Sequence, residues 1–200
     1  MTKIKFCGLR TLDDIYYANE LAPEYVGFVF APKSKRYVTP AQAEQLRNAL
    51  SKKICAVGVF VNENPAQVAE LLNNGIIDAA QLHGNEEDAY INNLRGLSNK
   101  PIIKAFQIHC ALRITNYALL SDFILIDAGA GDGKTFDWSL IKNLRREYFL
   151  AGGLNPNNVG DAIKLLNPFA VDVSSGIETD GRKDFGKMAA FANAVRKDFL

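Results

Sequence analysis

Small residues that expose the backbone follow two short apolar runs near the end of this 200-residue chain. Gly152 and Gly153 end the first run, and Ser174, Ser175 and Gly176 end the second. Such residues leave backbone N–H groups available to bind an anion at the end of a strand. Two of these strand ends side by side would bind a phosphate dianion. The sequence therefore predicts a phosphorylated small-molecule ligand.

Cys7 and Asp127 could move protons on that ligand, because each ends a short apolar run. One group that takes a proton and one that gives a proton suffice for an isomerisation that transfers a hydrogen. A thiol has a reference pKa near ~8.5, so a nearby dipole or cation would have to lower the pKa of Cys7. Two plainer interpretations stay open: Cys7 as a small buried apolar residue and Asp127 as a turn cap.

Arg36 and His83 offer two further polar groups to a ligand. Arg36 can bind a carboxylate through two parallel hydrogen bonds, or it can belong to a solvated basic loop with Lys33 and Lys35. His83 is a polar pocket wall, a second proton carrier or a turn residue. The chain has two histidines and no closely spaced histidine–cysteine cluster, so the sequence predicts no catalytic metal.

Eight strand–helix units are needed to position these residues. The expected strands span 4–7, 25–30, 55–61, 79–82, 101–106, 122–126, 148–151 and 169–173. The expected helices cover 11–21, 65–73, 86–97, 111–119 and 184–197, and three more begin at 39–40, 136–138 and 155–156. The strands are mostly continuous apolar runs, as in parallel sheets buried on both faces.

This pattern predicts an α/β protein: a single-domain (βα)8 TIM barrel over residues 1–200. An open doubly wound sheet of five or six strands would leave two units unassigned. In a (βα)8 barrel the active site lies at the C-terminal ends of the strands, and phosphate binds after strands seven and eight. The candidate residues lie at or after the C-terminal ends of the expected strands.

The composition of the chain argues against several classes of function. The chain has 23 basic and 22 acidic residues, a net charge of +1, which favours neither nucleic acid nor an anionic membrane as a partner. No apolar stretch approaches the ~20 residues of a membrane helix. The N-terminus lacks a signal-peptide pattern, and Cys7, Cys55 and Cys110 are too widely spaced for a disulfide framework. We therefore expect a cytoplasmic protein.

The glycine-rich segment 128–134 resembles a nucleotide-binding loop only superficially. Gly133, Lys134 and Thr135 match the end of a P-loop, but Ala128 stands where its first glycine is required. A dinucleotide-binding pattern that starts at Gly129 fails at Lys134. A lid or a third contributor to phosphate binding is the better interpretation.

Several segments together resemble the phosphoribosylanthranilate isomerase family of tryptophan biosynthesis, over nearly the whole chain. They are Lys-Phe-Cys-Gly-Leu (5–9), Val-Gly-Phe-Val-Phe-Ala-Pro-Lys-Ser-Lys-Arg-Tyr-Val-Thr-Pro (26–40), Gly-Val-Phe-Val-Asn (58–62), Gln-Leu-His-Gly (81–84), Gly-Lys-Thr-Phe-Asp-Trp (133–138), Ala-Gly-Gly-Leu-Asn-Pro (151–156) and Ala-Val-Asp-Val-Ser-Ser-Gly-Ile-Glu (170–178).

The resemblance implies an Amadori rearrangement of N-(5′-phosphoribosyl)anthranilate without a cofactor. It implies that Cys7 is the general base and Asp127 the general acid. It also implies that Arg36 holds the anthranilate carboxylate and that His83 lines the pocket. The phosphate would be bound by the small residues after strands seven and eight, namely Gly152, Gly153, Ser174, Ser175 and Gly176. The protein would be a monomer or a homodimer.

The chain departs from the family pattern in two places. Phe6 replaces a more usual isoleucine, which indicates a packing change in the barrel. The segment 128–134 looks short, and Ala130 and Asp132 replace a glycine and a small hydroxyl residue. A carboxylate at Asp132 would repel the phosphate unless it points to solvent or pairs with Lys134.

Alternative functions remain at this stage. One is another phosphosugar barrel, such as an indole-glycerol-phosphate synthase, expected to carry lysine and glutamate at strand ends, or an aminoaldose isomerase of histidine biosynthesis, which usually pairs two aspartates. Another is a non-catalytic barrel that senses a phosphorylated metabolite, which would tolerate the loss of Cys7 or Asp127.

Overall fold

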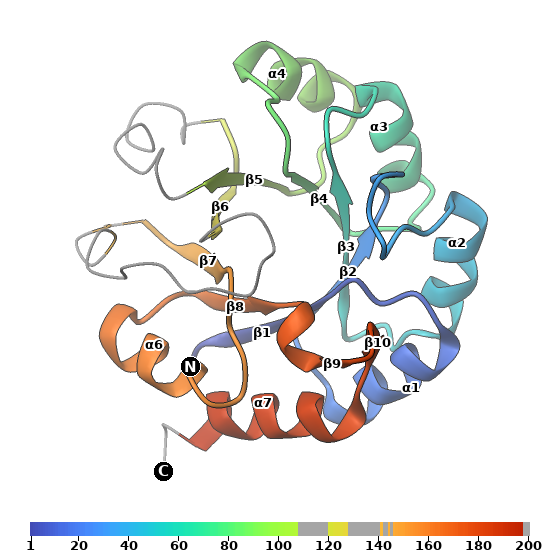
Figure 1. Cartoon of the computed structure of the whole chain (residues 1–200). Coiled ribbons are helices and arrows are strands. Elements are labelled where there is room, and N and C mark those ends of the chain that lie inside the picture. Colours follow the sequence, from blue (N-terminus) through green and yellow to red (C-terminus); the bar gives the residue numbers. More distant parts are fainter. Residues whose placement is uncertain (108–119, 128–140, 142–143, 145, 198–200) are drawn as a thin grey trace.

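Eight parallel strands form a closed barrel in the computed structural model, which describes residues 1–107, 120–127, 141, 144 and 146–197. The barrel strands are β1 (Lys3–Cys7), β2 (Tyr25–Val29), β3 (Cys55–Phe60), β4 (Ala79–Leu82), β5 (Ile102–Gln107), β6 (Phe123–Asp127), β7 (Tyr148–Ala151) and β8 (Ala170–Val173). Each pairs with the next along the chain, and β8 pairs with β1. Figure 1 looks into the ring of strands, with the helices outside it. The predicted (βα)8 barrel is confirmed.

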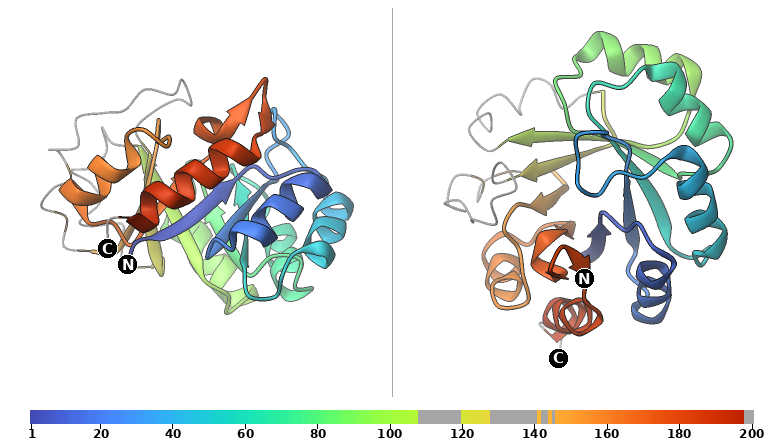
Figure 2. Two further views of the ribbon diagram at one scale, coloured as in Figure 1. Left: turned by 90° about the horizontal axis from the view of Figure 1, so that it is seen from below. Right: turned by 45° about the vertical axis from the view of Figure 1, so that its right-hand side comes forward.

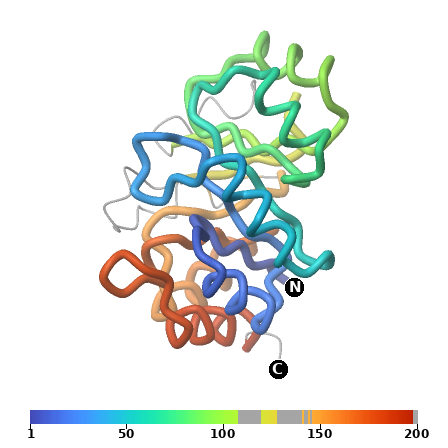
Figure 3. Tube along the Cα trace, turned by 90° about the vertical axis from the view of Figure 1, so that its right-hand side faces the viewer, coloured from blue at the N-terminus to red at the C-terminus, as the bar shows by residue number. Residues whose placement is uncertain are grey.

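The helices follow the strands and pack on the outside of the ring (Figure 2). They are α1 (Leu12–Leu21), α2 (Pro40–Ala49), α3 (Pro65–Asn73), α4 (Asp88–Leu97), α6 (Val159–Leu166) and α7 (Phe185–Lys197). The tube in Figure 3 shows the red end of the chain beside the blue start, where α7 and α1 adjoin β1. The barrel is therefore closed by contact between the first and last units.

Local sequence signals explain where the helices begin. Thr11 and Thr39 each accept a hydrogen bond from the backbone N–H three residues later, and a side chain there returns the bond, which forms a capping box at α1 and α2. Proline in the first turn fits α2 and α3, because its missing N–H would have no partner there.

Aromatic side chains fill the end of the barrel opposite the C-terminal ends of the strands. Phe149 is fully buried, with edge-on contacts to Tyr25, Phe123 and Phe169 at centroid separations of 5.2, 5.9 and 5.5 Å. This cluster lies at the starts of the strands, so it closes that end and leaves the other end open for a site. Phe6 packs elsewhere, edge-on to Phe191 of α7, which fits the packing change expected there.

Most element bounds agree with the predictions to within two residues, and two regions differ. The helix expected from 155–156 begins at Val159, because Asn155 donates its backbone N–H to Asn158 and the intervening residues form a turn. A two-strand hairpin, β9 (Glu178–Thr179) and β10 (Arg182–Lys183), was not predicted. The helices expected at 111–119 and from 136 lie outside the described residues, as does the 128–134 segment.

Candidate active site

A cavity of about 210 Å³ opens at the C-terminal ends of the strands. Eight of the nine predicted site residues line it: Cys7, Arg36, His83, Asp127, Gly152, Gly153, Ser174 and Ser175. Gly176 does not line it but packs directly behind, where a Cβ would lie 2.0 Å from the carbonyl oxygen of Leu154. The structure thus brings together residues that are up to 168 positions apart in the chain, from Cys7 to Ser175.

Cys7, at the end of β1, sits beside a buried ion pair. Lys5 lies two residues earlier on the same face of β1, is fully buried, and places its Nζ 3.0 Å from Oδ1 of Asp172 on β8. Gly27 of β2 faces this group: a Cβ there would lie 2.8 Å from the Cys7 Sγ and 3.3 Å from the Lys5 Nζ. Glycine at this position therefore leaves room for the thiol and the ammonium group side by side.

The electrostatic surroundings of Cys7 differ from the expectation. Burial raises the pKa of the Cys7 thiol, Lys5 and Lys183 lower it, and Asp172 raises it, so that the net direction is upward. For Lys5, burial lowers the pKa, but Asp172 and Cys7 outweigh burial and raise it. The predicted cation is present as Lys5, yet it does not bring the pKa of the thiol below its ordinary value, because dehydration of the thiolate costs more.

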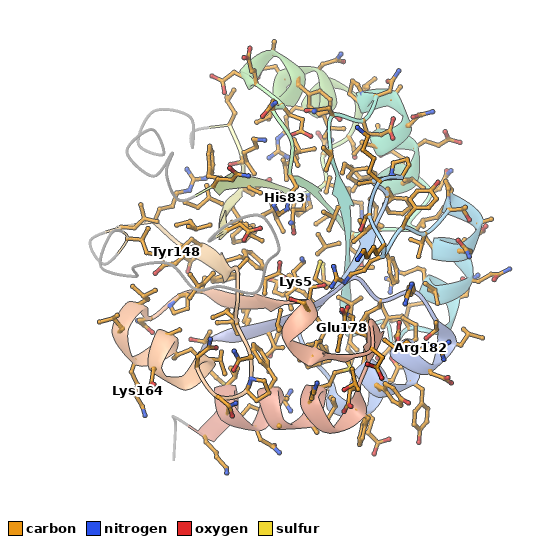
Figure 4. All side chains as sticks on the ribbon, viewed as in Figure 1. Lys5, His83, Tyr148, Lys164, Glu178 and Arg182 are labelled. Atoms are coloured by element: carbon orange, nitrogen blue, oxygen red, sulfur yellow. The ribbon has the colours of Figure 1, made fainter. Side chains whose placement is uncertain are left out.

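Asp127, at the end of β6, faces His83. The His83 Nε2 lies 3.2 Å from the Asp127 Oδ2, and the two side chains are 30% and 20% exposed. On its other side, His83 Nδ1 lies 2.9 Å from Nε2 of Gln81, which is buried in β4. Asp127 thus lies next to an imidazole, in a more exposed setting than Cys7. Figure 4 shows His83 and Lys5 near the middle of the barrel.

A second buried lysine shapes the loop that carries His83. Lys104 of β5 donates to the carbonyl oxygen of Gly84 and to Glu86, each at 2.8 Å. Glu86 also accepts from the backbone N–H groups of Asn62 and Gly84. Burial opposes ionisation of Glu86, but Lys104 and the backbone N–H groups of Asn62 and of Glu86 itself outweigh burial and lower the pKa of Glu86. This pair fixes the backbone directly after His83.

Arg36 reaches the cavity but already holds a protein carboxylate. Its Nε and Nη2 each donate to Glu178 at 2.7 Å. Among the described residues, the opposite edge of the guanidinium has no protein partner, so that edge could bind a ligand carboxylate. Gly8, at φ +77°, makes this path possible, because a Cβ there would lie 2.4 Å from the Arg36 Cδ. The solvated-loop interpretation of Arg36 is therefore wrong.

Gly152 and Gly153 both have positive φ, +89° and +67°, a backbone conformation that glycine adopts without strain. The Ser174 side chain holds two strands together. Its hydroxyl donates to the carbonyl oxygen of Cys7 at 3.0 Å and so ties β8 to β1. The backbone N–H groups of the 174–176 segment, rather than the Ser174 hydroxyl, are thus the candidate donors to an anion.

Sequence reasoning missed Lys183, a buried residue of the β9–β10 hairpin. Its Nζ donates to the carbonyl oxygen of Ser174 at 3.0 Å and to Glu178 at 2.7 Å. Burial opposes ionisation of Glu178, but Arg36 and Lys183 lower its pKa to about 2. Asp180 and Gly181, both at positive φ, form the hairpin turn, and an Asp-Gly pair is a sequence signal for such turns.

The described part of the chain has neither a metal-binding cluster nor a membrane-spanning helix. No group of three or more histidine, cysteine, aspartate or glutamate residues there could hold a metal ion. No helix in the same residues is long and apolar enough to cross a membrane.

Comparisons with known proteins agree on one family. Residues 4–194 match the family model for N-(5′-phosphoribosyl)anthranilate (PRA) isomerase. A relative of that name from Thermoanaerobacter sp. (strain X514) is 47% identical over 98% of both chains. The crystal structure of phosphoribosyl anthranilate isomerase from Thermotoga maritima has a TM-score of 0.87 at 37% identity, covering 98% of this chain and all of that one. A structure of the same kind of enzyme in complex with reduced 1-(o-carboxyphenylamino)-1-deoxyribulose 5-phosphate has a TM-score of 0.84 at 36% identity, with the same coverage.

Proposed function

Because the chain belongs to the N-(5′-phosphoribosyl)anthranilate isomerase family, we propose that its cavity performs that reaction with Cys7 and Asp127 as proton carriers. The reaction is the Amadori rearrangement of N-(5′-phosphoribosyl)anthranilate to 1-(2-carboxyphenylamino)-1-deoxyribulose 5-phosphate in tryptophan biosynthesis. The observation that carries the assignment of roles is that one cavity has a thiol, a carboxyl group and an anion-binding loop in its wall.

Asp127 acts first, as the general acid. Its carboxyl group donates a proton to the ribose ring oxygen while the bond from that oxygen to C1′ breaks. The anilino nitrogen supplies the electron pair for the new C1′=N bond, which leaves an open-chain Schiff base and an aspartate carboxylate. His83, which lies 3.2 Å from the Asp127 Oδ2, is placed to donate a hydrogen bond to that carboxylate as the proton leaves.

Cys7 acts second, as the general base, in its thiolate form. It takes the proton from C2′, and the released electron pair forms the C1′=C2′ bond and neutralises the nitrogen. The resulting enolamine becomes the ketone when its hydroxyl loses a proton and C1′ gains one, so the whole sequence is an isomerisation. The neighbouring Lys5 ammonium stabilises the thiolate, although burial keeps the thiol pKa above its ordinary value.

The remaining residues bind parts of the substrate that do not react. The backbone of Gly152, Gly153 and the 174–176 segment binds the phosphate, and Arg36 binds the anthranilate carboxylate. Binding at both ends holds the pentose between the two proton carriers, so that remote binding energy aligns the reacting atoms. Glu178 holds the Arg36 guanidinium from behind, through two hydrogen bonds of 2.7 Å.

The alternative phosphosugar enzymes fit this cavity less well. A histidine-pathway aminoaldose isomerase usually has two aspartates, whereas here a thiol lies across the mouth from Asp127. The barrel does place lysines inside, but Lys5 and Lys104 are paired with Asp172 and Glu86. Lys104 and Glu86 are a lysine–glutamate pair, but neither residue lines the cavity, and an indole-glycerol-phosphate synthase is expected to carry its lysine and glutamate at the strand ends.

Anthranilate fluorescence tests the proposed function. The protein is added to phosphoribosylanthranilate generated enzymatically in the cuvette, and the emission is followed over time. Isomerisation predicts a continuous loss of emission, at a rate proportional to protein concentration. A change that stops after one equivalent per protein would indicate a phosphometabolite sensor and would overturn the enzyme assignment.

A further inference from the structure

Gln81 is buried in the barrel wall, 1% exposed, and lines the same cavity as Asp127 and His83. It lies in the middle of β4, where its neighbours in the sheet are Val59 of β3 and Ile103 of β5. His83 follows two residues later, so both side chains point to the same side of the strand. The placement of the Gln81 amide is therefore fixed by the barrel itself rather than by a loop.

The contact between Gln81 and His83 determines which imidazole nitrogen carries a proton. The amide Nε2 of Gln81 lies 2.9 Å from the Nδ1 of His83. An amide nitrogen can donate a hydrogen bond but cannot accept one, so with the amide in this orientation Nδ1 is the acceptor and lacks a proton. A neutral imidazole then carries its proton on Nε2, the nitrogen that lies 3.2 Å from the Asp127 Oδ2.

We propose that Gln81 is a positioning residue for the isomerase reaction, which holds His83 as a hydrogen-bond donor to Asp127 and so directs the carboxyl proton of Asp127 toward the substrate. The inference rests on the proposed function of Asp127 as the general acid. If the Nε2–H of His83 occupies Oδ2, the acidic proton of Asp127 resides on the other oxygen, Oδ1. The same hydrogen bond stabilises the carboxylate that forms when this proton is given up.

The opposite orientation of the amide would undo this arrangement. The Oε1 of Gln81 is buried and has no hydrogen-bond partner among the described residues, which is unfavourable because the oxygen has lost its contact with water. A half-turn of the amide would bring Oε1 to Nδ1 and give it a partner, but Nδ1 would then need the proton. The unprotonated Nε2 would then face the Oδ2 of Asp127 as an acceptor. That contact is favourable only while Oδ2 carries the acidic proton and can donate it. The amide orientation that keeps His83 a hydrogen-bond donor to Asp127 therefore leaves Oε1 without a partner.

Nitrogen NMR can read the tautomer directly, because the chain has only two histidines, His83 and His109. The ring nitrogens are observed in the uniformly 15N-labelled full chain, and a His109→Asn variant assigns the signals. We expect the His83 signals of an Nε2–H tautomer in the wild-type protein and a tautomer mixture in Gln81→Met. Gln81→Glu, which can only accept from Nδ1, should protonate that nitrogen. An Nδ1–H tautomer in the wild-type protein would overturn the proposal.

Kinetics supply the second readout. Gln81→Met, similar in size but without a donor, should lower kcat on the order of 10-fold and change KM by less than about twofold, since substrate binding is untouched. Gln67→Met, an exposed glutamine on α3, is the matched control and should behave as wild type. Thermal melts of each variant show whether the fold is retained.

A double-mutant cycle separates positioning from general structural damage. If Gln81 acts only through His83, adding Gln81→Met to His83→Asn should cause no further loss of kcat. Additive losses would overturn the proposal. A wild-type protein without isomerase activity would instead refute the proposed function. The NMR experiment would still test the His83 tautomer, because it does not depend on activity.

Discussion

Two buried lysine–carboxylate pairs lie on either side of the barrel mouth, and they act on different things. Lys5 and Asp172, 3.0 Å apart, lie beside the Cys7 thiol and shift its pKa in opposite directions. Lys104 and Glu86, 2.8 Å apart, bind backbone groups of the loop that follows β4. The first pair changes the electrostatics of the proposed base, whereas the second fixes the backbone next to His83.

The difference between the pairs matches the needs of the two proton carriers. A thiol must ionise to act as a base, so charge beside Cys7 directly changes its reactivity. A carboxyl group is a competent acid in a more exposed site, and what it needs is a fixed direction for its proton. Asp127 accordingly has the His83 imidazole beside it, and Gln81 lies on the other side of that imidazole. The base side therefore depends on charge and the acid side on geometry.

The largest effect should come from removing the acidic proton. Asp127→Asn keeps the size of the side chain and an oxygen that can accept from His83, but it has no proton of comparable acidity. We expect kcat to fall by about 10²–10⁴-fold with KM little changed, as is usual for the loss of a general acid. The fluorescence assay measures both constants. A kcat within a few-fold of wild type would move the acid role to another residue.

The next largest effect should distinguish the two buried lysines. Because the pKa of Cys7 is raised, the thiolate fraction and kcat/KM of the wild-type protein should still rise with pH through neutrality. Lys5→Met removes the cation that favours the thiolate, so the rise should move to higher pH and activity at pH 7 should fall on the order of 10-fold. The pH profile of kcat/KM gives the measurement.

Lys104→Met is the matched control for this prediction. Removing one partner of a buried pair costs about 3–5 kcal/mol of stability in either case, so both variants should unfold more easily. Only Lys5→Met should shift the pH profile of kcat/KM. The double variant Lys5→Met, Asp172→Asn should regain stability, because no unpaired charge is left buried, but its pH profile should stay shifted. Equal shifts for both lysines would contradict the distinction between the two regions.

The smallest effect on kcat should be seen at Arg36, whose side-chain hydrogen bonds go to Glu178 rather than to Cys7 or Asp127. Arg36→Met removes a binding contact to the anthranilate carboxylate and leaves Glu178 with Lys183 as its remaining partner. We expect KM to rise by about 10-fold with kcat nearly unchanged, as for the loss of a binding interaction present in both ground and transition states. A fall in kcat alone would assign Arg36 to the chemical step.

The barrel could be predicted from sequence because each unit carries its own signal. Apolar runs mark β1 to β8, and Thr39 with Pro40 marks the start of α2. That the candidate site residues lie together could be predicted because the fold gathers the strand ends at one rim. The ionisation of these residues could not be predicted from sequence. The raised pKa of Cys7, for example, follows from burial and from Asp172 of β8, which is 165 residues away in the chain. Such effects depend on packing between distant segments.

The hairpin after β8 shows where a local signal was available but unused. Asp180 and Gly181 predict a tight turn, yet nothing local indicates that Lys183 folds back to Glu178 and Ser174. Gln81 is similar, because a polar residue inside an apolar strand is a clue to a buried contact. Its partner, His83, is only two residues away, but the direction of the hydrogen bond needed atomic positions.

The kcat of Cys7→Ala tests the central claim most directly, since it asks whether the thiol at one side of the cavity takes the proton from C2′. We predict a loss of kcat by orders of magnitude with KM close to that of the wild-type protein, measured by anthranilate fluorescence on a variant with an unchanged melting temperature. A nearly normal kcat would contradict the account and would move the base to His83 or Asp172.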